Sequence, residues 1–114
     1  MVRIINQTKN AILAIDVQVA DTVLKRMKGL LGRKTFRAGE ALVLKPSNSI
    51  HTLFMSFPID VLFLDKENKV IDAITMPPSR LSKIYFHSVL VVELPVGTIR
   101  QTLTQKGDVI DISL

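Results

Sequence analysis

Short segments of apolar or alternating residues, each closed by residues typical of turns, most limit what this chain can fold into. They run for four to seven residues, at 41–44, 50–54, 59–64, 70–76, 89–94 and 109–114. Short runs rich in valine, isoleucine and phenylalanine, bounded by proline, glycine, asparagine or aspartate, are typical of β-strands. Asp65 to Lys69 lies between two such runs and predicts a hairpin turn. The sequence therefore predicts a chain built mainly from strands.

The first forty residues add one strand and one helix. Residues 12–19 alternate between apolar and polar side chains, which predicts a half-buried strand. Apolar residues then recur at helical spacing from Val23 to Leu31, after a capping residue at Asp21 or Thr22. A further helical turn is predicted at 98–103. We expect the longer helix to pack on the sheet through Leu24, Met27, Leu30 and Leu31.

Length and composition fit a single domain over residues 1–114. Hydrophobic residues make up 47% of the chain and charged residues 22%, as in a globular domain with one buried core. The predicted fold is mainly β (α+β): an antiparallel β-sandwich or partly open barrel with one short helix covering an end. No apolar run approaches the ~20 residues of a membrane-spanning helix, and the N-terminal residues form no hydrophobic leader. We therefore expect a cytoplasmic monomer or weak dimer with no membrane partner.

The net charge of +5 is concentrated in one segment. Residues 25–45 contain seven basic residues and one acidic residue, so this segment carries +6 and the remainder of the chain carries −1. Such a charge could attract an acidic partner or a nucleic acid, although a solvated helix face followed by a basic loop has the same pattern. With one tyrosine and no tryptophan, a base-stacking platform is not indicated, and we expect nucleic-acid binding to be unlikely. The predicted basic rim consists of Arg26, Arg33, Lys34 and Arg37.

Two ionisable residues interrupt the apolar stretch at 49–65 before Asp65 closes it. Burying an imidazole or a carboxylate is costly unless the group is paired, so His51 and Asp60 need a reason to be there. Each is the nearest partner for the other, and we expect the two side chains to interact at the edge of a concave pocket. The alternative is structural, with Asp60 accepting hydrogen bonds from loop amides or from His51 and so fixing the turn at Phe57-Pro58. The candidate binding residues are His51, Thr52, Met55 and Asp60.

Glu93 is a carboxylate inside the apolar segment at 89–94. We expect it to form a structural ion pair with Arg26 or Arg33, which would hold the helix against the sheet. No cofactor is predicted, since the sequence has neither a glycine-rich phosphate loop nor a dinucleotide fingerprint. No metal site is predicted either, because the chain has no cysteine and its two histidines lack ligand spacing.

Several of these segments, in this order, resemble a small bacterial and archaeal family known as domain of unknown function one-nine-two. The similarity runs from about residue 15 to the C-terminus and implies a β-rich fold, while it implies no chemistry. Its most specific part is the Ile-His-Thr version of the central motif, Ser49-Ile50-His51-Thr52-x-x-Met55-x-Phe57-Pro58-Ile59-Asp60-Val61. The remaining parts are Val19-Ala20-Asp21-Thr22, Arg26-x-x-Gly29-Leu30-Leu31-Gly32-Arg33, Gly39-Glu40-Ala41-Leu42, Val92-Glu93-Leu94-Pro95-x-Gly97 and Gly107-Asp108.

The function most consistent with these features is binding. We expect a groove floored by His51, Met55 and Asp60, bordered by the basic segment, that accepts an anionic small molecule, a peptide segment or an acidic partner. One alternative is a hydrolase-like enzyme with His51 as base and Asp60 orienting it. A second alternative is a nucleic-acid-associated protein that uses the basic segment. We expect no catalysed reaction.

Overall fold

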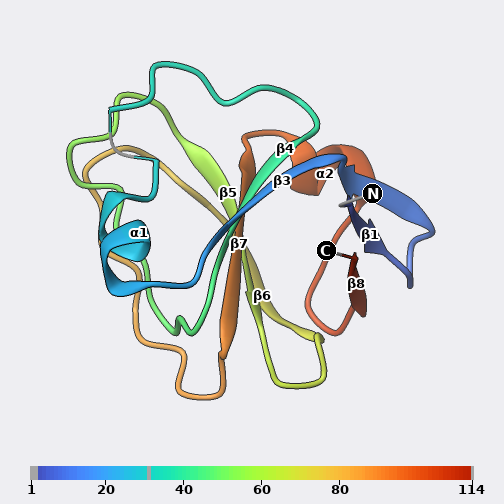
Figure 1. Cartoon of the computed structure of the whole chain (residues 1–114). Helices are drawn as coiled ribbons and strands as arrows, with labels where there is room; N and C mark the ends of the chain where they lie inside the picture. Colours follow the sequence, from blue (N-terminus) through green and yellow to red (C-terminus); the bar gives the residue numbers. More distant parts are fainter. Residues whose placement is uncertain (1–2, 31, 114) are drawn as a thin grey trace.

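The computed structural model describes residues 3–30 and 32–113. In these two ranges the chain forms eight strands and two short helices (Figure 1). The elements are β1 (Arg3–Asn6), β2 (Ala11–Ala14), β3 (Asp16–Ala20), α1 (Val23–Lys28), β4 (Glu40–Leu44), β5 (Ile59–Leu64), β6 (Val70–Met76), β7 (Leu90–Pro95), α2 (Thr98–Thr102) and β8 (Ile110–Ser113). None of the helices in the described ranges is long and apolar enough to cross a membrane.

The strands form two sheets. A three-stranded antiparallel sheet has the order β2-β1-β8, and a five-stranded sheet has the order β3-β4-β7-β5-β6. In the larger sheet β3 and β4 are parallel and the other neighbours are antiparallel. Figure 1 shows the small sheet at one side of the large one and α1 at the other. The predicted mainly β fold is confirmed: the described ranges form two sheets that do not close into a barrel, together with short helices.

The large sheet is buried on both of its faces. One face packs against the small sheet through Leu62, Leu64, Val92 and Leu94, together with Ile4 from β1. The other face packs against α1 and the long loops through Leu42, Val61, Phe63 and Val91, among others. Since neighbouring residues of a strand point to opposite faces, the central strands β5 and β7 supply alternate residues to the two cores. We call these the small-sheet face and the loop face.

The predicted strand at 12–19 is wrong as a single element. Its first half is β2 in the small sheet, and its second half is β3 in the large sheet. Between them the chain turns at Ile15, whose side chain is exposed, and the amides of Ile15 and Asp16 both donate to the carbonyl of Gly39. The alternation therefore comes from two half-buried strands in succession. No predicted element covers β1, which is the central strand of the small sheet.

The predicted strand at 50–54 is also wrong. Only one bridge, between His51 and Leu81, joins this segment to a neighbour as a strand would. The chain then turns from Thr52 to Met55, where the Met55 amide donates to the Thr52 carbonyl and Phe54 has a φ of +66°. The left-handed backbone of Phe54 cannot continue a strand. The segments 48–52 and 80–85 instead lie side by side as paired loops.

Helix α1 is shorter than the sequence predicts. The side chain of Thr22 accepts a hydrogen bond from the Lys25 amide and begins the helix, and Gly29, with a φ of +45°, ends it. Leu30 is buried as expected, but Leu24 is 79% exposed, so its predicted packing on the sheet is wrong. The side chain of Met27 and residue Leu31 lie outside the described part of the structure.

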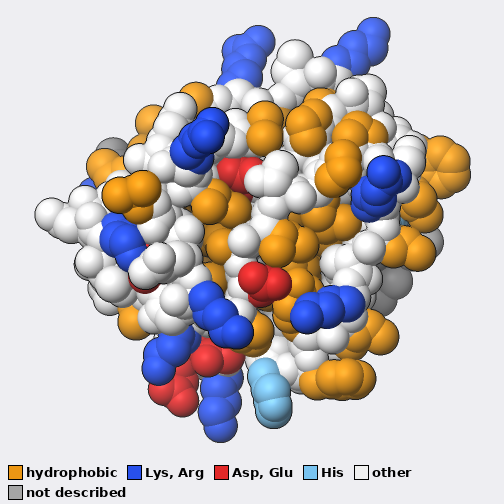
Figure 2. Space-filling view, turned by 180° about the vertical axis from the view of Figure 1, so that it is seen from behind, with side chains coloured by type: hydrophobic (Ala, Val, Ile, Leu, Met, Phe, Trp, Pro, Cys, Tyr) orange, Lys and Arg blue, Asp and Glu red, His pale blue; other side chains and the backbone are white. Residues whose placement is uncertain are grey.

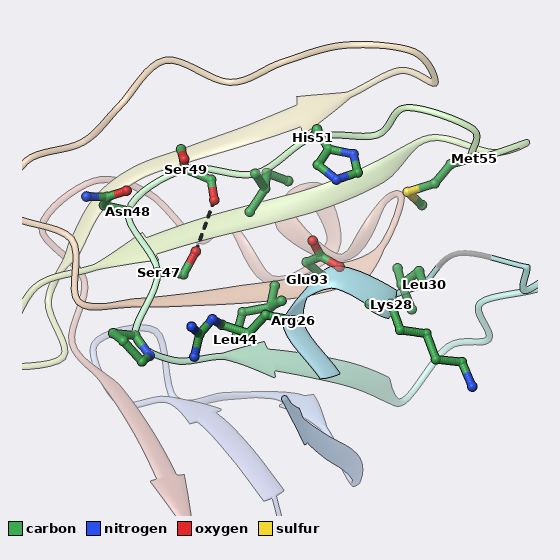
Figure 3. Close-up of a pocket in the computed structure, with 13 residues that line it drawn as sticks. Arg26, Lys28, Leu30, Leu44, Ser47, Asn48, Ser49, His51, Met55 and Glu93 are labelled. Carbon is green, nitrogen blue, oxygen red and sulfur yellow. Dashed lines mark hydrogen bonds between the residues drawn. The ribbon is translucent and has the colours of Figure 1, made fainter. Parts of the chain in front are cut away.

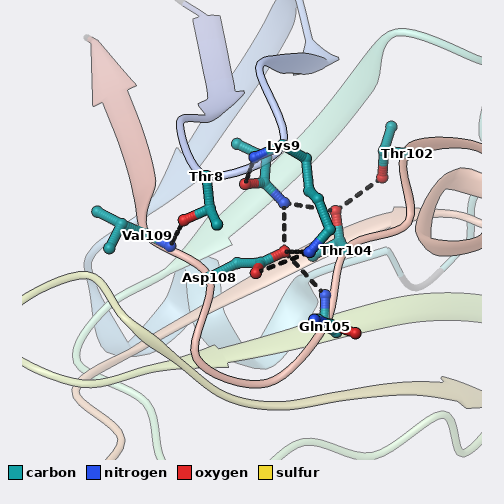
Figure 4. A network of polar contacts seen from close by, with 8 residues as sticks. Thr8, Lys9, Thr102, Thr104, Gln105, Asp108 and Val109 are labelled. Atoms are coloured by element: carbon teal, nitrogen blue, oxygen red, sulfur yellow. Dashed lines mark hydrogen bonds and ion pairs between the residues drawn. The ribbon is translucent and has the colours of Figure 1, made fainter.

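A polar network joins the small sheet to the turn that precedes β8 (Figure 4). The amide group of Asn6 donates to Thr104 Oγ1 at 3.0 Å and to Asp108 Oδ2 at 2.9 Å. Lys9 Nζ lies 3.1 Å from Asp108 Oδ1, and the Gln105 amide donates to Asp108 Oδ2. Because these buried groups satisfy one another, the network is a structural feature.

Candidate functional site

A pocket of about 350 Å³ opens on the loop face of the large sheet, between α1 and the segment that follows β4. Its floor is the middle of β7, and one wall is formed by α1 (Figure 3). The residues that line it are Arg26, Lys28, Gly29, Leu30, Leu44, Pro46, Ser47, Asn48, Ser49, Ile50, His51, Met55 and Glu93.

Glu93 lies at the floor of this pocket because of its place in β7. It pairs with Leu42 of β4 on one side and with Val61 of β5 on the other. Both neighbours, like Val91 two residues earlier, belong to the core of the loop face. The strand alternation therefore directs the carboxyl group of Glu93 among apolar side chains and toward the pocket.

The carboxyl group of Glu93 lies in apolar surroundings and opens only toward the pocket. The residue is 5% exposed and has no hydrogen bond or ion pair to another described residue. No fully buried side-chain oxygen of the described residues lacks a hydrogen bond, so the carboxyl oxygens of Glu93 keep contact with the open space of the pocket. Burial raises the pKa of Glu93 from 4.5 to about 8, with no compensating charge or hydrogen bond. The predicted ion pair of Glu93 with Arg26 or Arg33 is therefore wrong. Arg33 instead forms an ion pair with Glu40, with 2.6 Å between Nη2 and Oε2.

Three further charged or titratable residues lie at the edge of the pocket. Arg26 comes from α1, and its Nη1 donates to the carbonyl of Lys45 at 3.4 Å. Figure 3 shows the ring of His51 above Glu93, whereas the amine of Lys28 extends away from the pocket. Arg26 is therefore the basic side chain best placed to contact a ligand inside.

His51 and Asp60 do not meet, so the predicted interaction between them is wrong. His51 is exposed and lines the pocket on the loop face. Asp60 is 1% exposed and lies two and four residues before Leu62 and Leu64 in β5. It therefore shares their face of the sheet, which is the small-sheet face. The large sheet stands between the two side chains, and the enzyme alternative loses its proposed base and orienting carboxylate.

Asp60 holds the turn before α2 in place. Its Oδ2 accepts hydrogen bonds from the amides of Gly97 at 3.0 Å and Ile99 at 2.9 Å, and its Oδ1 accepts one from Thr75 Oγ1 at 2.7 Å. This is the structural alternative that the sequence left open, although the turn is at 95–99 and not at Phe57-Pro58.

The other candidate residues divide between the pocket and the scaffold. Met55 lines the pocket, as expected for the groove. Thr52 is fully buried outside it, and its hydroxyl group bonds to the carbonyl of Pro77 at 2.6 Å and to the amide of Arg80 at 2.9 Å. Thr52 therefore joins the two paired loops.

Of the predicted basic rim, only Arg26 borders this pocket. Arg33, Lys34 and Arg37 lie in the segment between α1 and β4, beside other hollows of the surface. The side-chain hydrogen bond from Arg33, followed by that from the Arg37 amide, lowers the pKa of Glu40. This cluster is a local ion pair that fixes the segment. Figure 2 shows the face of the molecule opposite to that in Figure 1, where Lys and Arg side chains stand apart around exposed hydrophobic ones and form no continuous band.

Glu93 was named from the sequence, but its place in a pocket was missed. Its signal is a single acid in a strand whose other residues are apolar, which shows that the position is unusual but not what surrounds it. The other pocket residues come from three separate segments, 26–30, 44–51 and 55. Only the fold brings them to one place.

Comparison with known proteins identifies the family. The family DUF192, described as uncharacterized ACR, matches residues 4–112. The chain belongs to this family. A UPF0127 protein of Thermococcus kodakarensis is 37% identical over 111 residues, which cover 94% of this chain and 71% of the relative. A UPF0127 protein of Pyrococcus abyssi is 32% identical over an alignment that covers 95% of this chain and 95% of the relative. The resemblance found in the sequence is thereby confirmed.

Two solved structures share the fold. A Novosphingobium aromaticivorans protein of unknown function has a TM-score of 0.78 at 15% identity, covering 96% of this chain and 82% of that protein. A Sinorhizobium meliloti protein, described as a "putative transcription regulator", has a TM-score of 0.80 at 19% identity, covering 97% and 91%. At these identities the similarity concerns the fold alone.

Proposed function

We propose that this DUF192 protein is a binding protein whose pocket accepts a small amphiphilic molecule with an anionic, oxygen-bearing head group. The observation that carries this proposal is the carboxyl group of Glu93, which is 5% exposed, faces only the pocket and has no hydrogen bond to another described residue. Native proteins leave very few buried polar groups without a hydrogen bond. A ligand in the pocket would supply the missing partner.

The chemistry of the pocket favours an oxygen acceptor with a negative charge. With a pKa of about 8, Glu93 retains its proton at pH 7, and its hydroxyl group is then a hydrogen-bond donor. Arg26 at the pocket edge carries a guanidinium group, whose planar set of donors suits a carboxylate or phosphate. A head group between the two residues would accept a hydrogen bond from protonated Glu93 and would be attracted by the positive charge of Arg26.

The walls favour an apolar remainder. Leu30, Leu44, Ile50 and Met55 line the space beyond the two charged residues. The volume of about 350 Å³ is at the lower end of the ~300–1,000 Å³ typical of ligand pockets, which favours a ligand smaller than a nucleotide. Methionine adapts its shape to different apolar groups, so Met55 suits a pocket that accepts a flexible chain.

An NMR titration of ¹⁵N-labelled protein with hexanoate tests the proposal, with hexanol as the uncharged probe. We expect hexanoate at pH 7 to shift the amide signals of Gly29, Leu30, Ile50 and Glu93, and hexanol to bind at least tenfold more weakly. Arg26→Gln should weaken hexanoate binding, because the charge at the head group is lost. Arg37→Gln, which removes a basic residue outside the pocket, is the matched control and should have no effect.

The pH dependence supplies a second test of the same site. Above pH 8 the carboxyl group of Glu93 ionises and repels an anionic probe, so hexanoate binding by the wild type should weaken. Glu93→Gln keeps a hydrogen-bond donor that cannot ionise, and its binding should be the same on both sides of pH 8. If millimolar hexanoate leaves the pocket amides unshifted, or if hexanol binds as well as hexanoate, the proposed ligand class is wrong.

The nucleic-acid alternative has less support. Arg33 is neutralised by Glu40, and Arg26 lies at the pocket. The description of the Sinorhizobium meliloti protein belongs to that protein, and its 19% identity gives no reason to extend it to this chain.

A further inference from the structure

A second surface is formed by the paired loops 45–58 and 77–89, the first of which also supplies seven of the residues that line the pocket. Hydrogen bonds from the Thr52 amide to Arg80, from the Ser82 amide to Ile50 and from the Tyr85 amide to Asn48 hold the two loops side by side. They cover the loop face of the large sheet as one layer. We call this layer the paired-loop surface.

The layer has an inner and an outer side. Ile50, Met55, Phe57 and Tyr85 point inward and pack against the core, where the ring of Tyr85 stacks on Phe63 with 4.0 Å between centroids. Other large apolar side chains of the two loops are exposed to solvent. Phe54 is 89% exposed, Leu81 72%, Ile84 55%, Phe86 85% and Val89 44%. These are five of the ten large hydrophobic side chains exposed in the described part of the chain.

Both phenylalanines stand at the tips of tight turns. Phe54 lies in the turn closed by the hydrogen bond from Met55 to Thr52, and Phe86 lies in the turn closed by that from Ser88 to Tyr85. Phe54 also has a φ of +66°, a left-handed conformation that glycine or asparagine adopts at lower cost than a bulky residue. Neither burial nor backbone preference explains a phenyl ring at this position, whereas contact with an apolar partner does.

The charges of the two loops all have one sign. Residues 45–58 and 77–89 contain Lys45, Arg80 and Lys83, two histidines, and no aspartate or glutamate. Of the neighbouring acids, Asp72 accepts a hydrogen bond of 2.7 Å from the hydroxyl group of Tyr85, and Glu93 lies in the pocket beneath loop 45–58. The surface therefore combines protruding apolar tips with fixed positive charge.

We propose that the paired-loop surface docks this protein on an anionic phospholipid bilayer. Apolar tips that enter the acyl boundary, with cationic side chains at the level of the head groups, are the pattern of peripheral membrane contacts. Aromatic rings on separate turns suit insertion into lipid, whereas a protein partner needs a continuous packed patch. The sequence-based expectation of no membrane partner depended on the absence of a spanning segment, and a peripheral contact needs none. This proposal is independent of the ligand in the pocket.

Flotation with unilamellar vesicles tests the proposal, using phosphatidylcholine alone and a mixture of phosphatidylcholine with phosphatidylglycerol. The wild type should float with the mixed vesicles at low salt and remain largely unbound with phosphatidylcholine alone. Phe54→Ser combined with Phe86→Ser should lower the partition coefficient by roughly tenfold for each ring. Arg80→Gln combined with Lys83→Gln should lower it several-fold and weaken its dependence on salt.

Matched controls come from exposed apolar residues elsewhere in the fold. Leu103, which is 69% exposed and has a φ of +57°, and Ile12, which is 59% exposed, lie outside the paired loops. Changing both to serine should leave flotation unchanged, and circular dichroism should show that all variants fold. The proposal is overturned if the wild type does not float with the mixed vesicles, or if the control pair loses as much binding as the phenylalanine pair. Binding to RNA or to polyglutamate that needs Arg80 and Lys83, without flotation, would assign the surface to another partner and also refute it.

Discussion

The isolated carboxyl group of Glu93 should make the stability of this protein fall as the pH rises. Glu93 has a pKa of about 8 in the folded chain, against 4.5 for an unperturbed group. Between these values the unfolded chain releases the proton while the folded chain retains it. The free energy of unfolding therefore decreases by about 1.4 kcal/mol for each pH unit in this interval. Below pH 4.5 both states are protonated and the contribution vanishes.

The expected magnitude is large for a domain of this size. The accumulated loss is about 3 kcal/mol at pH 7 and approaches about 5 kcal/mol above pH 8. Domains of this kind have a total stability of roughly 5–15 kcal/mol. One side chain therefore removes a substantial part of the stability at neutral pH.

Glu93→Gln isolates this effect, because glutamine has the shape of protonated glutamate and cannot ionise. Urea unfolding of both proteins should be followed by far-UV circular dichroism, since the chain has no tryptophan and only one tyrosine. The stability of the variant minus that of the wild type should increase by about 3 kcal/mol from pH 4.5 to pH 7 and level off above pH 8. Taking the difference cancels the titration of all other groups.

Glu40→Gln is the matched control. Its hydrogen bonds from the Arg33 side chain and the Arg37 amide lower the pKa of Glu40, so this carboxylate stabilises the fold above pH 4.5 and loses that effect in acid. The difference between Glu40→Gln and the wild type should stay constant from pH 5 to pH 8. If the curves of Glu93→Gln and the wild type are parallel over the same range, the carboxyl group of Glu93 is solvated or paired and the reasoning fails.

Three further predictions concern the scaffold. Leu30→Ala should cost about 2–5 kcal/mol in denaturant melts, since Leu30 is 4% exposed, whereas Leu24→Ala should change stability by less than about 0.5 kcal/mol; equal losses would contradict the described docking of α1. Asp60→Ala leaves the two amides at the start of α2 without an acceptor and should cost about 3 kcal/mol, while the pocket amides keep their NMR shifts. Burial alone would raise the pKa of Asp108, but hydrogen bonds from Asn6, Gln105 and Lys9 together lower it. The wild type should therefore lose stability below pH 4 more steeply than Asp108→Asn does, and identical acid melts would contradict this.

Local sequence patterns identified the strands of the large sheet because those strands have regular, uninterrupted apolar character. β4, β5, β6 and β7 all lie within two residues of their predicted bounds. The same patterns wrongly predicted single strands at 12–19 and 50–54. In the first segment the chain passes from one sheet to the other, and in the second it turns back. At Ile15 the change of sheet is fixed by hydrogen bonds to the distant Gly39. Such long-range contacts leave no local periodicity to detect.

The sequence-based prediction of the candidate site was wrong for a different reason. Every residue of β5 is buried, and so are five of the six residues of β7. When both faces of a strand are buried, apolar alternation no longer tells the faces apart. Asp60 and Glu93 were both recognised as unusual, but only the register of the sheet shows that Asp60 faces the small sheet and Glu93 faces the pocket. The pairing of His51 with Asp60 was inferred without that information.

Three acids of the described residues are almost fully buried, and they differ in whether hydrogen bonds offset the cost of burying them. Asp60 and Asp108 each accept several hydrogen bonds, so their burial is offset by the turns that they hold. Glu93 has no such hydrogen bonds to the described residues. A leucine in its place would match the apolar residues around it, and the protein would then not lose stability through this position as the pH rises. Chains tolerate a destabilising group mainly where activity depends on it. Because no described residue bonds to the carboxyl group of Glu93 and the strand directs it into a pocket, the stability that it costs is the expected consequence of the proposed binding role.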